Sequence, residues 1–281
     1  MRLFCFGYGY SAESLVHRLS PRDVVAAGTR TSLTEIPELS IQLVAYKGDA
    51  ASADVRRLLA DTTHLLVSIP PDLEGDVVLR QYREDIAALP DLAWIGYLST
   101  VGVYGDHKGA WVDEETPTRP TSERSLRRLR AEQAWLDFRD ESGKRVEIFR
   151  LSGIYGPGRS VIDNLKAGTA RRIIKPDQVF NRIHVDDVAR ALVAAIDKDA
   201  GHAIYNVSDD EPARPEDVVA YAAELLGLAI PPAIAFEAAN LTGMAASFWA
   251  ESKRVRNARI REALGVELLY PTYREGLRAL A

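Results

Sequence analysis

The stretch RLFCFGYGYSA, residues 2–12, decides the fold of this chain. The apolar run Arg2–Phe6 predicts a buried strand, and a glycine-rich turn follows it directly. In that turn Gly7 would permit a tight bend and Gly9 would let the backbone approach a pyrophosphate, while the small Ala12 would let a helix pack on the strand. The start of the helix adds free N–H groups and a positive dipole end. We therefore expect a dinucleotide-binding loop; the alternative is an ordinary glycine turn.

The rest of the first half alternates short apolar runs with stretches of helical spacing. This alternation predicts an α/β protein with a Rossmann-type doubly wound parallel sheet. Strands are expected at Arg2–Phe6, Val24–Ala27, Ile41–Tyr46, His64–Ser68, Ala93–Leu98 and Val146–Leu151, and helices at Ala12–Leu19, Ala53–Ala60, Gly75–Leu89 and Ser122–Phe138.

The second half is less regular, and its elements are scattered. A strand is expected at Ile204–Val207, and helices at Asp186–Ile196, Pro215–Leu226, Ser252–Leu264 and Tyr273–Leu280. Because these pieces are too dispersed for an independent core, we expect one domain over residues 1–281. Its small C-terminal substrate lobe would be formed mainly by residues 153–180 and 208–281, over the ligand edge of the sheet.

The residues after the second strand bear on the choice of cofactor. NAD-specific proteins usually place an acid there for the ribose hydroxyls, but the sequence is GTRTS, residues 28–32. Arg30 would pair with a 2′-phosphate with help from Thr31, which predicts NADP; the alternative is a solvated Arg30 and tolerance of both NADP and NAD. Asp49 would accept from the adenine amino group or cap the next helix. The expected cofactor-binding residues are Gly7, Tyr8, Gly9, Tyr10, Ser11, Arg30, Thr31, Asp49, Ser68, Ile69 and Pro70.

Composition excludes several classes of protein. With 40 acidic and 35 basic residues the net charge is −5, which argues against nucleic acid as a partner. A single cysteine, Cys5, allows no disulfide framework, and the five scattered histidines lack the close spacing of metal ligands, so we expect no metal site. The sequence holds no apolar run of the length of a membrane span. We expect a soluble cytoplasmic protein that acts on a small molecule.

Three later motifs make the chain resemble a known family. These motifs are LSTVGVYGD at 98–106, RLSGIYGPG at 150–158 and RIHVDDVA at 182–189. Together with the glycine loop they are similar to the extended short-chain dehydrogenase/reductases, the NAD(P)-dependent epimerase/dehydratase group. The spacing of the loop glycines is more similar to an atypical branch of that superfamily.

The resemblance implies a catalytic Ser/Thr, with a Tyr and a Lys four residues apart on one helix. Thr100 stands at the Ser/Thr position, but Arg124 and Arg128 stand at the positions of the Tyr and Lys. An arginine has no accessible neutral form near pH 7, so Arg124 cannot act as the acid/base. Tyr104 is a candidate substitute; the alternative is a packed loop residue, since its Tyr-x-x-x-Lys spacing to Lys108 falls in loop sequence.

On the substrate side we expect Tyr155, Arg159 and Arg182, the arginines as ligands of a phosphate or carboxylate; the alternative is surface arginines on turns. The resemblance also implies a homodimer through the helices at 75–89 and 122–138; the alternative is that the apolar stripe of 122–138 packs in the core. The sequence thus predicts an NADP-binding oxidoreductase, epimerase or dehydratase. Its substrate would be a small polar molecule, and an anionic molecule also fits this prediction. The alternative is a catalytically silent NADP-binding redox sensor or regulatory protein.

Overall fold

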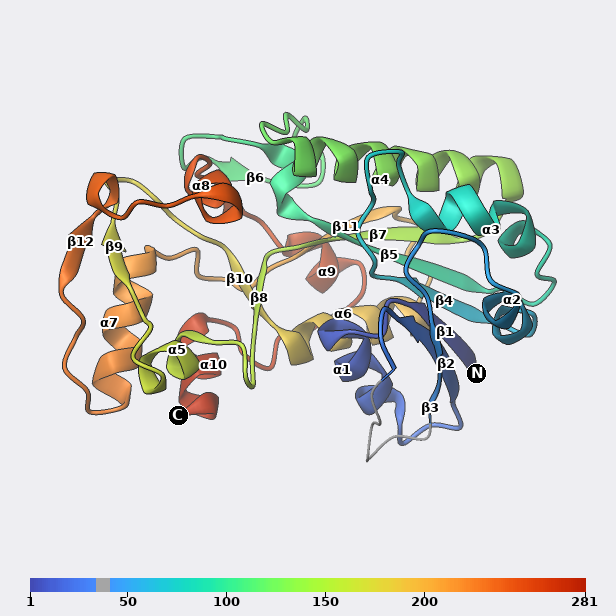
Figure 1. Ribbon diagram of the computed structural model, residues 1–281, viewed down its shortest axis with the longest axis horizontal. Helices are drawn as coiled ribbons and strands as arrows, with labels where there is room; N and C mark the ends of the chain where they lie inside the picture. Colours follow the sequence, from blue (N-terminus) through green and yellow to red (C-terminus); the bar gives the residue numbers. More distant parts are fainter. Residues whose placement is uncertain (34–40) are drawn as a thin grey trace.

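The computed structural model describes residues 1–33 and 41–281, and it is built around one parallel sheet (Figure 1). The sheet has seven strands in the order β11-β7-β5-β4-β1-β2-β3. Their bounds are β1 Arg2–Phe6, β2 Val25–Arg30, β3 Ile41–Ala45, β4 His64–Val67, β5 Trp94–Thr100, β7 Val146–Leu151 and β11 Ile204–Val207. The chain moves outward from β1 to β3, returns to β4 on the other side of β1, and then continues outward to β11. The Rossmann-type doubly wound sheet is confirmed, with its switch point between β1 and β4.

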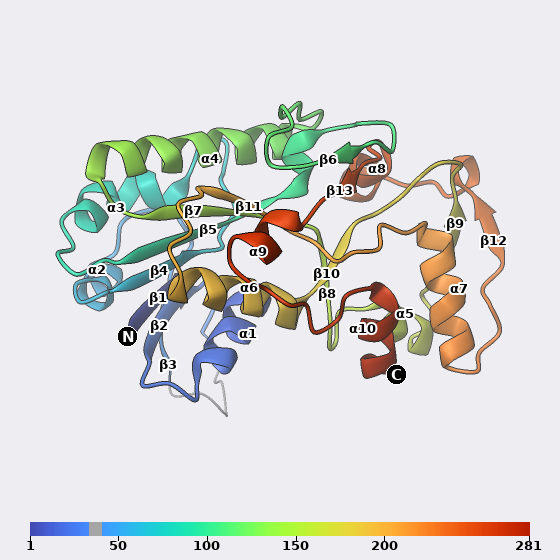
Figure 2. The same ribbon diagram turned by 180° about the vertical axis from the view of Figure 1, so that it is seen from behind.

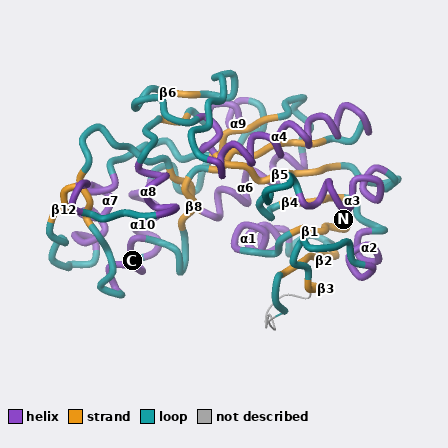
Figure 3. The backbone as a smooth tube through the Cα atoms, turned by 45° about the horizontal axis from the view of Figure 1, so that its top comes forward, coloured by secondary structure: helices purple, strands orange, loops and turns teal. Residues whose placement is uncertain are grey.

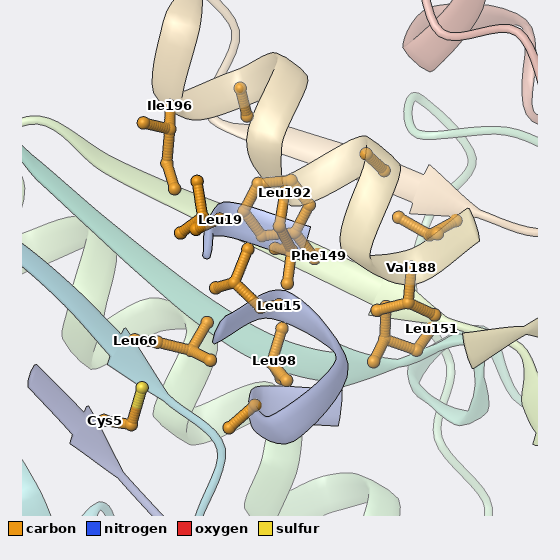
Figure 4. Close-up of a cluster of buried hydrophobic side chains, with 14 of the residues drawn as sticks. Cys5, Leu15, Leu19, Leu66, Leu98, Phe149, Leu151, Val188, Leu192 and Ile196 are labelled. Carbon is orange, nitrogen blue, oxygen red and sulfur yellow. The ribbon is translucent and has the colours of Figure 1, made fainter. Parts of the chain in front are cut away.

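Helices cover both faces of the sheet. One face is covered by α1 Tyr10–Leu19, α6 Val185–Asp197 and α9 Ala258–Glu262, and the other by α2 Ala53–Leu59, α3 Val77–Ala87 and α4 Glu123–Ser142. Figure 4 shows side chains of α1 and α6, such as Leu15 and Leu192, packed above sheet residues such as Leu66 and Phe149. Strand β1 is buried on both sides: Cys5 packs with α1 and Phe4 with the opposite cluster. This burial explains why strand sequences read as continuous apolar runs.

The remaining elements extend beyond the carboxyl edge of the sheet (Figures 2 and 3). They are η1 Val101–Tyr104, β6 Trp111–Val112, β8 Gly153–Tyr155, α5 Val161–Lys166, β9 Arg172–Ile174, β10 Arg182–His184, α7 Pro215–Leu225, β12 Ala233–Ala235, η2 Phe236–Ala238, α8 Gly243–Trp249, β13 Arg254–Val255 and α10 Tyr273–Leu280. Three parallel pairs, β8 with β10, β9 with β12 and β6 with β13, join segments distant in sequence. We keep the substrate lobe as the proposed role of these segments.

The prediction of a single helix at Ser252–Leu264 is wrong. The structure instead forms β13 and the shorter α9. The Ser252 N–H donates to Asp106 Oδ1 at 2.9 Å, and Arg254 N–H donates to Ala110 O at 2.9 Å, so the first half of the stretch is drawn out beside β6. Lys253 is buried and its Nζ donates to Gly105 O at 2.7 Å, a contact that a surface helix would not provide. Tertiary contacts therefore override the helical spacing.

Within residues 1–33 and 41–281, no helix is both long and apolar enough to cross a membrane.

Candidate functional site

The candidate site follows the carboxyl ends of four neighbouring strands. Along this edge, Arg30 ends β2, Gly7 follows β1, Ser68 follows β4 and Thr100 ends β5 (Figure 1). In open α/β sheets, ligands bind in the crevice outside these ends at the switch point. The fold therefore brings together predicted cofactor residues and the predicted Thr100, which lie far apart in sequence.

Gly7 is a glycine for two reasons. Its φ is +88°, which side chains rarely adopt, and a Cβ would lie 2.6 Å from Ser68 Oγ and 2.7 Å from Ile69 Cγ2. The turn is held by two bonds to β2: Gly7 N–H donates to Thr29 Oγ1 at 2.9 Å and Tyr8 N–H donates to Thr29 O at 2.7 Å. The turn is thus fixed against both neighbours of β1.

Gly9 differs, because a Cβ there would meet no atom within 4 Å. Gly9 is also the N-cap of α1, and no side chain caps this helix end. The first intrahelical bond is Glu13 N–H to Gly9 O, at 2.8 Å, so the N–H groups of Tyr10, Ser11 and Ala12 precede the helical ladder. The residues fit a pyrophosphate: the open space lies beside a backbone without side chain and at the positive end of a helix.

Two tyrosines of the loop have different surroundings. The Tyr8 side chain is buried in the core with α1, so any cofactor contact of Tyr8 comes from its backbone. The Tyr10 hydroxyl instead donates to Pro157 O at 3.1 Å, across to the loop after β8.

Arg30 lies against the glycine loop. Its Nε donates to Tyr8 O at 2.7 Å, its guanidinium carbon lies 5.4 Å from the centre of the Tyr8 ring, and Nη2 is 3.9 Å from the Glu13 carboxylate. Thr31 follows it and is exposed. A phosphate on this side of the loop would take the place of the Glu13 carboxylate as the anion beside Arg30.

Asp49 is exposed, and its Oδ1 accepts from the Ala50 N–H at 3.0 Å. The N-cap of α2 is Ser52, so the expectation that Asp49 also caps this helix is wrong: it lies too far ahead of Ala53 to reach the orphan N–H groups. Ser68 and Ile69 both contact the Gly7 turn, the former through a hydrogen bond from Oγ to Gly7 O, and Pro70 is exposed beyond them.

Thr100 ends β5 at the open edge. Its Oγ1 accepts from the Gly102 N–H at 3.1 Å and thereby starts η1. A Cβ on Gly102 would lie 2.8 Å from Ser125 Oγ and 3.4 Å from Thr100 Oγ1, so the first turn of α4 lies close to Thr100. Because Oγ1 accepts in this bond, its own O–H remains available as a donor.

Arg124 and Arg128 project from the same face of α4, four residues apart. Arg128 Nη1 donates to Tyr97 Oη at 3.0 Å and to Leu98 O at 2.9 Å, near the end of β5. The guanidinium carbon of Arg124 lies 5.6 Å from the centre of the Phe248 ring on α8. Burial and the nearby Arg128 both lower the pKa of Arg124.

Tyr104 is placed in the core rather than in the crevice. The side chain is 0% exposed, and its hydroxyl donates to Asn206 Oδ1 at 2.8 Å while accepting from Arg150 Nη1 at 3.0 Å. Burial raises the pKa of Tyr104 to about 12, against the opposing effect of Arg150. Without access to a ligand and with a high pKa, this hydroxyl is poorly suited to acid/base work. Lys108 follows in a loop with a φ of 50°, off any shared helical face.

Sequence reasoning missed the ion pair beneath Tyr104. Arg150 on β7 and Glu132 on α4 are 4% and 2% exposed, and Arg150 Nη2 donates to Glu132 Oε2 at 2.8 Å. Ser99 Oγ donates to Glu132 Oε1. The available signal was an arginine within an apolar strand, because a buried charge requires a partner.

The residues expected on the substrate side lie in different parts of the structure. Tyr155 packs in the lobe cluster, and a Cβ on Gly276 of α10 would lie 2.0 Å from its hydroxyl, so we place it in the packing of the lobe. Arg159 instead lies over the glycine loop, with its guanidinium carbon 5.7 Å from the centre of the Tyr10 ring. This position favours the cofactor side over the substrate side.

Arg182 is turned toward backbone groups of the lobe. Its Nη1 donates to Phe180 O at 3.1 Å and to Ala213 O at 3.4 Å. Asp209 lies within electrostatic range; burial raises the pKa of this carboxyl and Arg182 opposes the rise. Two residues further on, His184 caps α6, because its Nδ1 accepts from the Asp186 N–H at 3.2 Å.

The doubly wound parallel sheet with a glycine loop at its switch point defines a Rossmann-type fold. Residues 92–208 match the model of the NAD dependent epimerase/dehydratase family. A solved structure of a functionally unknown conserved protein from Silicibacter pomeroyi is 47% identical, with 99% of this chain and 97% of that chain covered and a TM-score of 0.86. Protein YeeZ of Escherichia coli K12 is 29% identical over 94% of both chains. The fold also matches dTDP-glucose 4,6-dehydratase of Bacillus anthracis, solved in complex with NAD, at 18% identity, TM-score 0.81 and coverage of 100% and 95%. Residues 92–208 are therefore similar to the NAD dependent epimerase/dehydratase family, and these relatives align with nearly the whole length of the chain.

Proposed function

We propose that this chain binds a nicotinamide dinucleotide across the carboxyl edge of its sheet and prefers NADP to NAD. It then acts as an oxidoreductase, epimerase or dehydratase on a small polar substrate. The observation that carries this proposal is the open space beside Gly9 at the uncapped start of α1. The binding of a nicotinamide dinucleotide is also supported by the Bacillus dehydratase of the same fold, which was solved in complex with NAD.

The order of residues along the edge gives the cofactor a direction. Gly9 and the start of α1 would hold the pyrophosphate, and Arg159 would cover it from the loop above Tyr10. The adenosine half would lie toward Arg30 and Asp49, which leaves the nicotinamide half on the side of Ser68 and Thr100. When bound, the nicotinamide ring supplies hydride transfer.

Thr100 is the hydroxyl that we assign to substrate orientation. Its oxygen accepts from the Gly102 N–H, so its O–H remains available to donate to a substrate. Tyr104 is left out of the catalytic groups because its hydroxyl is buried. The acidic residues of the loop at 113–117 are not assigned as a catalytic base, because Glu114 accepts from the Asn206 N–H at 2.8 Å and Glu115 accepts from Arg259.

The activity is tested by following NADPH and NADH absorbance against a panel of sugars, nucleotide sugars and small carbonyl compounds. For a substrate that turns over, Thr100→Val should lower kcat about 100-fold, because it removes one oriented donor from the reaction centre. Thr100→Ser retains the hydroxyl and should keep most of the activity. Equal rates for the Val variant and the wild type would remove Thr100 from the mechanism.

The preference for NADP is tested by Arg30→Ala. A hydrogen bond to a charged group contributes about 1.5–3 kcal/mol, so the variant should bind NADP at least about tenfold more weakly with little change for NAD. Arg18→Ala, an exposed arginine on the far end of α1, is the matched control. Calorimetric titration with both cofactors gives the result, and a preserved preference would refute the role of Arg30.

A silent NADP-binding sensor is the second candidate. It is favoured by the arginines at positions 124 and 128 and by the buried Tyr104 hydroxyl, which leave the hydroxyl of Thr100 without an evident acid/base partner. This candidate predicts the same cofactor binding and no turnover with any member of the panel.

The homodimer through α3 and α4 stays a prediction. The apolar residues of α4 point inward, with Trp135 and Phe138 buried in the core beside α3. Sedimentation of the purified chain measures its state. A cytoplasmic location is likewise proposed, in keeping with the buried, unpaired Cys5.

A further inference from the structure

We propose that Arg124 and Arg128 hold an oxyanion of the substrate, a phosphate or a carboxylate, beside Thr100. This inference deepens the proposed function and rests on it, because the anion is taken to be part of the substrate. The anion site itself is a property of the chain and can be tested without cofactor or turnover.

The first argument is the charge balance of the pair. Within residues 1–33 and 41–281, neither Arg124 nor Arg128 forms an ion pair with an Asp or Glu. By contrast, Arg150, on the strand β7 next to β5, forms an ion pair with Glu132. Burial raises the pKa of the Asp76 carboxyl and the charge of Arg128 opposes the rise, but no ion pair forms, and Asp76 Oδ1 accepts from the N–H groups of Val78 and Leu79.

The second argument is spacing. Like charges at positions i and i+4 of a helix repel each other, and the charge of Arg128 adds to the larger effect of burial in lowering the pKa of Arg124. An anion between the two guanidinium groups would turn the repulsion into attraction. Planar guanidinium groups bind phosphate and carboxylate by paired, charge-assisted hydrogen bonds.

The third argument is preorganisation at the site. Arg128 is held against β5 by hydrogen bonds to Tyr97 Oη and Leu98 O. Both bonds come from its Nη1. Arg124 is steadied from the other side by the ring of Phe248, a side chain that is 53% exposed on α8. Ser125, next to Arg124, has its Oγ 2.8 Å from the place of a Cβ on Gly102, and Thr100 Oγ1 lies 3.4 Å from that same place, so an anion held at this turn of α4 would lie near the end of β5.

The test is arginine modification by phenylglyoxal, mapped by mass spectrometry on the whole apo chain. The reagent attacks neutral guanidine, so the exposed Arg124 with its lowered pKa should react readily. Inorganic phosphate or malonate at constant ionic strength should slow its modification several-fold. Arg130, exposed on the same helix, is the internal control and should be unaffected.

Protection by phosphate alone identifies a phosphate ligand, and protection by malonate alone or by both identifies a site open to carboxylates. Arg128→Met should abolish the protection while Arg124 still reacts. The proposal is overturned if neither anion protects Arg124, or if Arg124 and Arg130 are slowed equally. A chain that shows protection but binds no NADP keeps the anion site and loses the proposed function.

Discussion

Glu132→Ala is expected to lower the free energy of unfolding by about 3–5 kcal/mol, the usual cost of removing one partner of a buried ion pair. The loss follows from what stays behind. Arg150 is 4% exposed, and its Nε and Nη2 both donate to the Glu132 carboxylate, Nε at 3.2 Å to each oxygen. In the variant this guanidinium would be buried without a counter-charge, and Ser99 would lose its acceptor.

Two controls make the prediction specific. The double variant Glu132→Leu with Arg150→Met removes both charges and should recover most of the loss, since apolar residues of similar volume can replace a buried pair. Arg22→Ala breaks a surface pair with Asp197 in which the side chains are 42% and 48% exposed, and should cost less than about 1 kcal/mol. Urea unfolding measures all three. A loss for Glu132→Ala no larger than that for Arg22→Ala would show that the buried pair does not stabilise the fold as described.

Gly9→Val is expected to weaken cofactor binding by more than about 100-fold, equivalent to about 3 kcal/mol, without unfolding the chain. The backbone of Gly9 has φ −116° and ψ −164°, an extended conformation that suits valine. Because a Cβ there meets no protein atom within 4 Å, the new side chain would fill the space that the pyrophosphate needs. Titration by calorimetry, with thermal unfolding in parallel, separates the two effects.

Gly7→Ala provides the contrast. Its Cβ would collide with Ser68 and Ile69, and the residue would be held at a positive φ, so this variant should unfold at a lower temperature. If Gly9→Val bound NADPH as tightly as the wild type, the pyrophosphate would lie elsewhere.

The sheet could be predicted from the sequence because its strands are buried on both faces. Every strand expected in the first half forms, with ends that differ by a few residues; β2, for example, ends at Arg30 rather than Ala27. The stretch at 252–264 could not be predicted, since its conformation depends on Asp106, Gly105 and β6, all contributed by a loop far away in sequence. Residues 34–40 lie outside the described part of the chain, and no sequence prediction falls on them.

The grouping of the expected cofactor residues could be predicted because these residues follow strands directly. Gly7, Arg30, Ser68 and Thr100 lie on one edge as a consequence of parallel strands. The partners of single side chains were not predictable in the same way. Nothing in the local sequence of Tyr104 indicates that Arg150 and Asn206 bind its hydroxyl. In the same way, the sequence around Arg159 does not indicate that this side chain lies over Tyr10.

The central claim is that the glycine loop binds a nicotinamide dinucleotide, and direct titration of the apo chain with NADPH and NADH tests it. We predict one binding site per chain, tighter binding of NADPH than of NADH, and a higher unfolding temperature in proportion to the tighter binding. A chain that binds neither cofactor, with no change in its unfolding temperature at millimolar concentrations of both, would contradict the account.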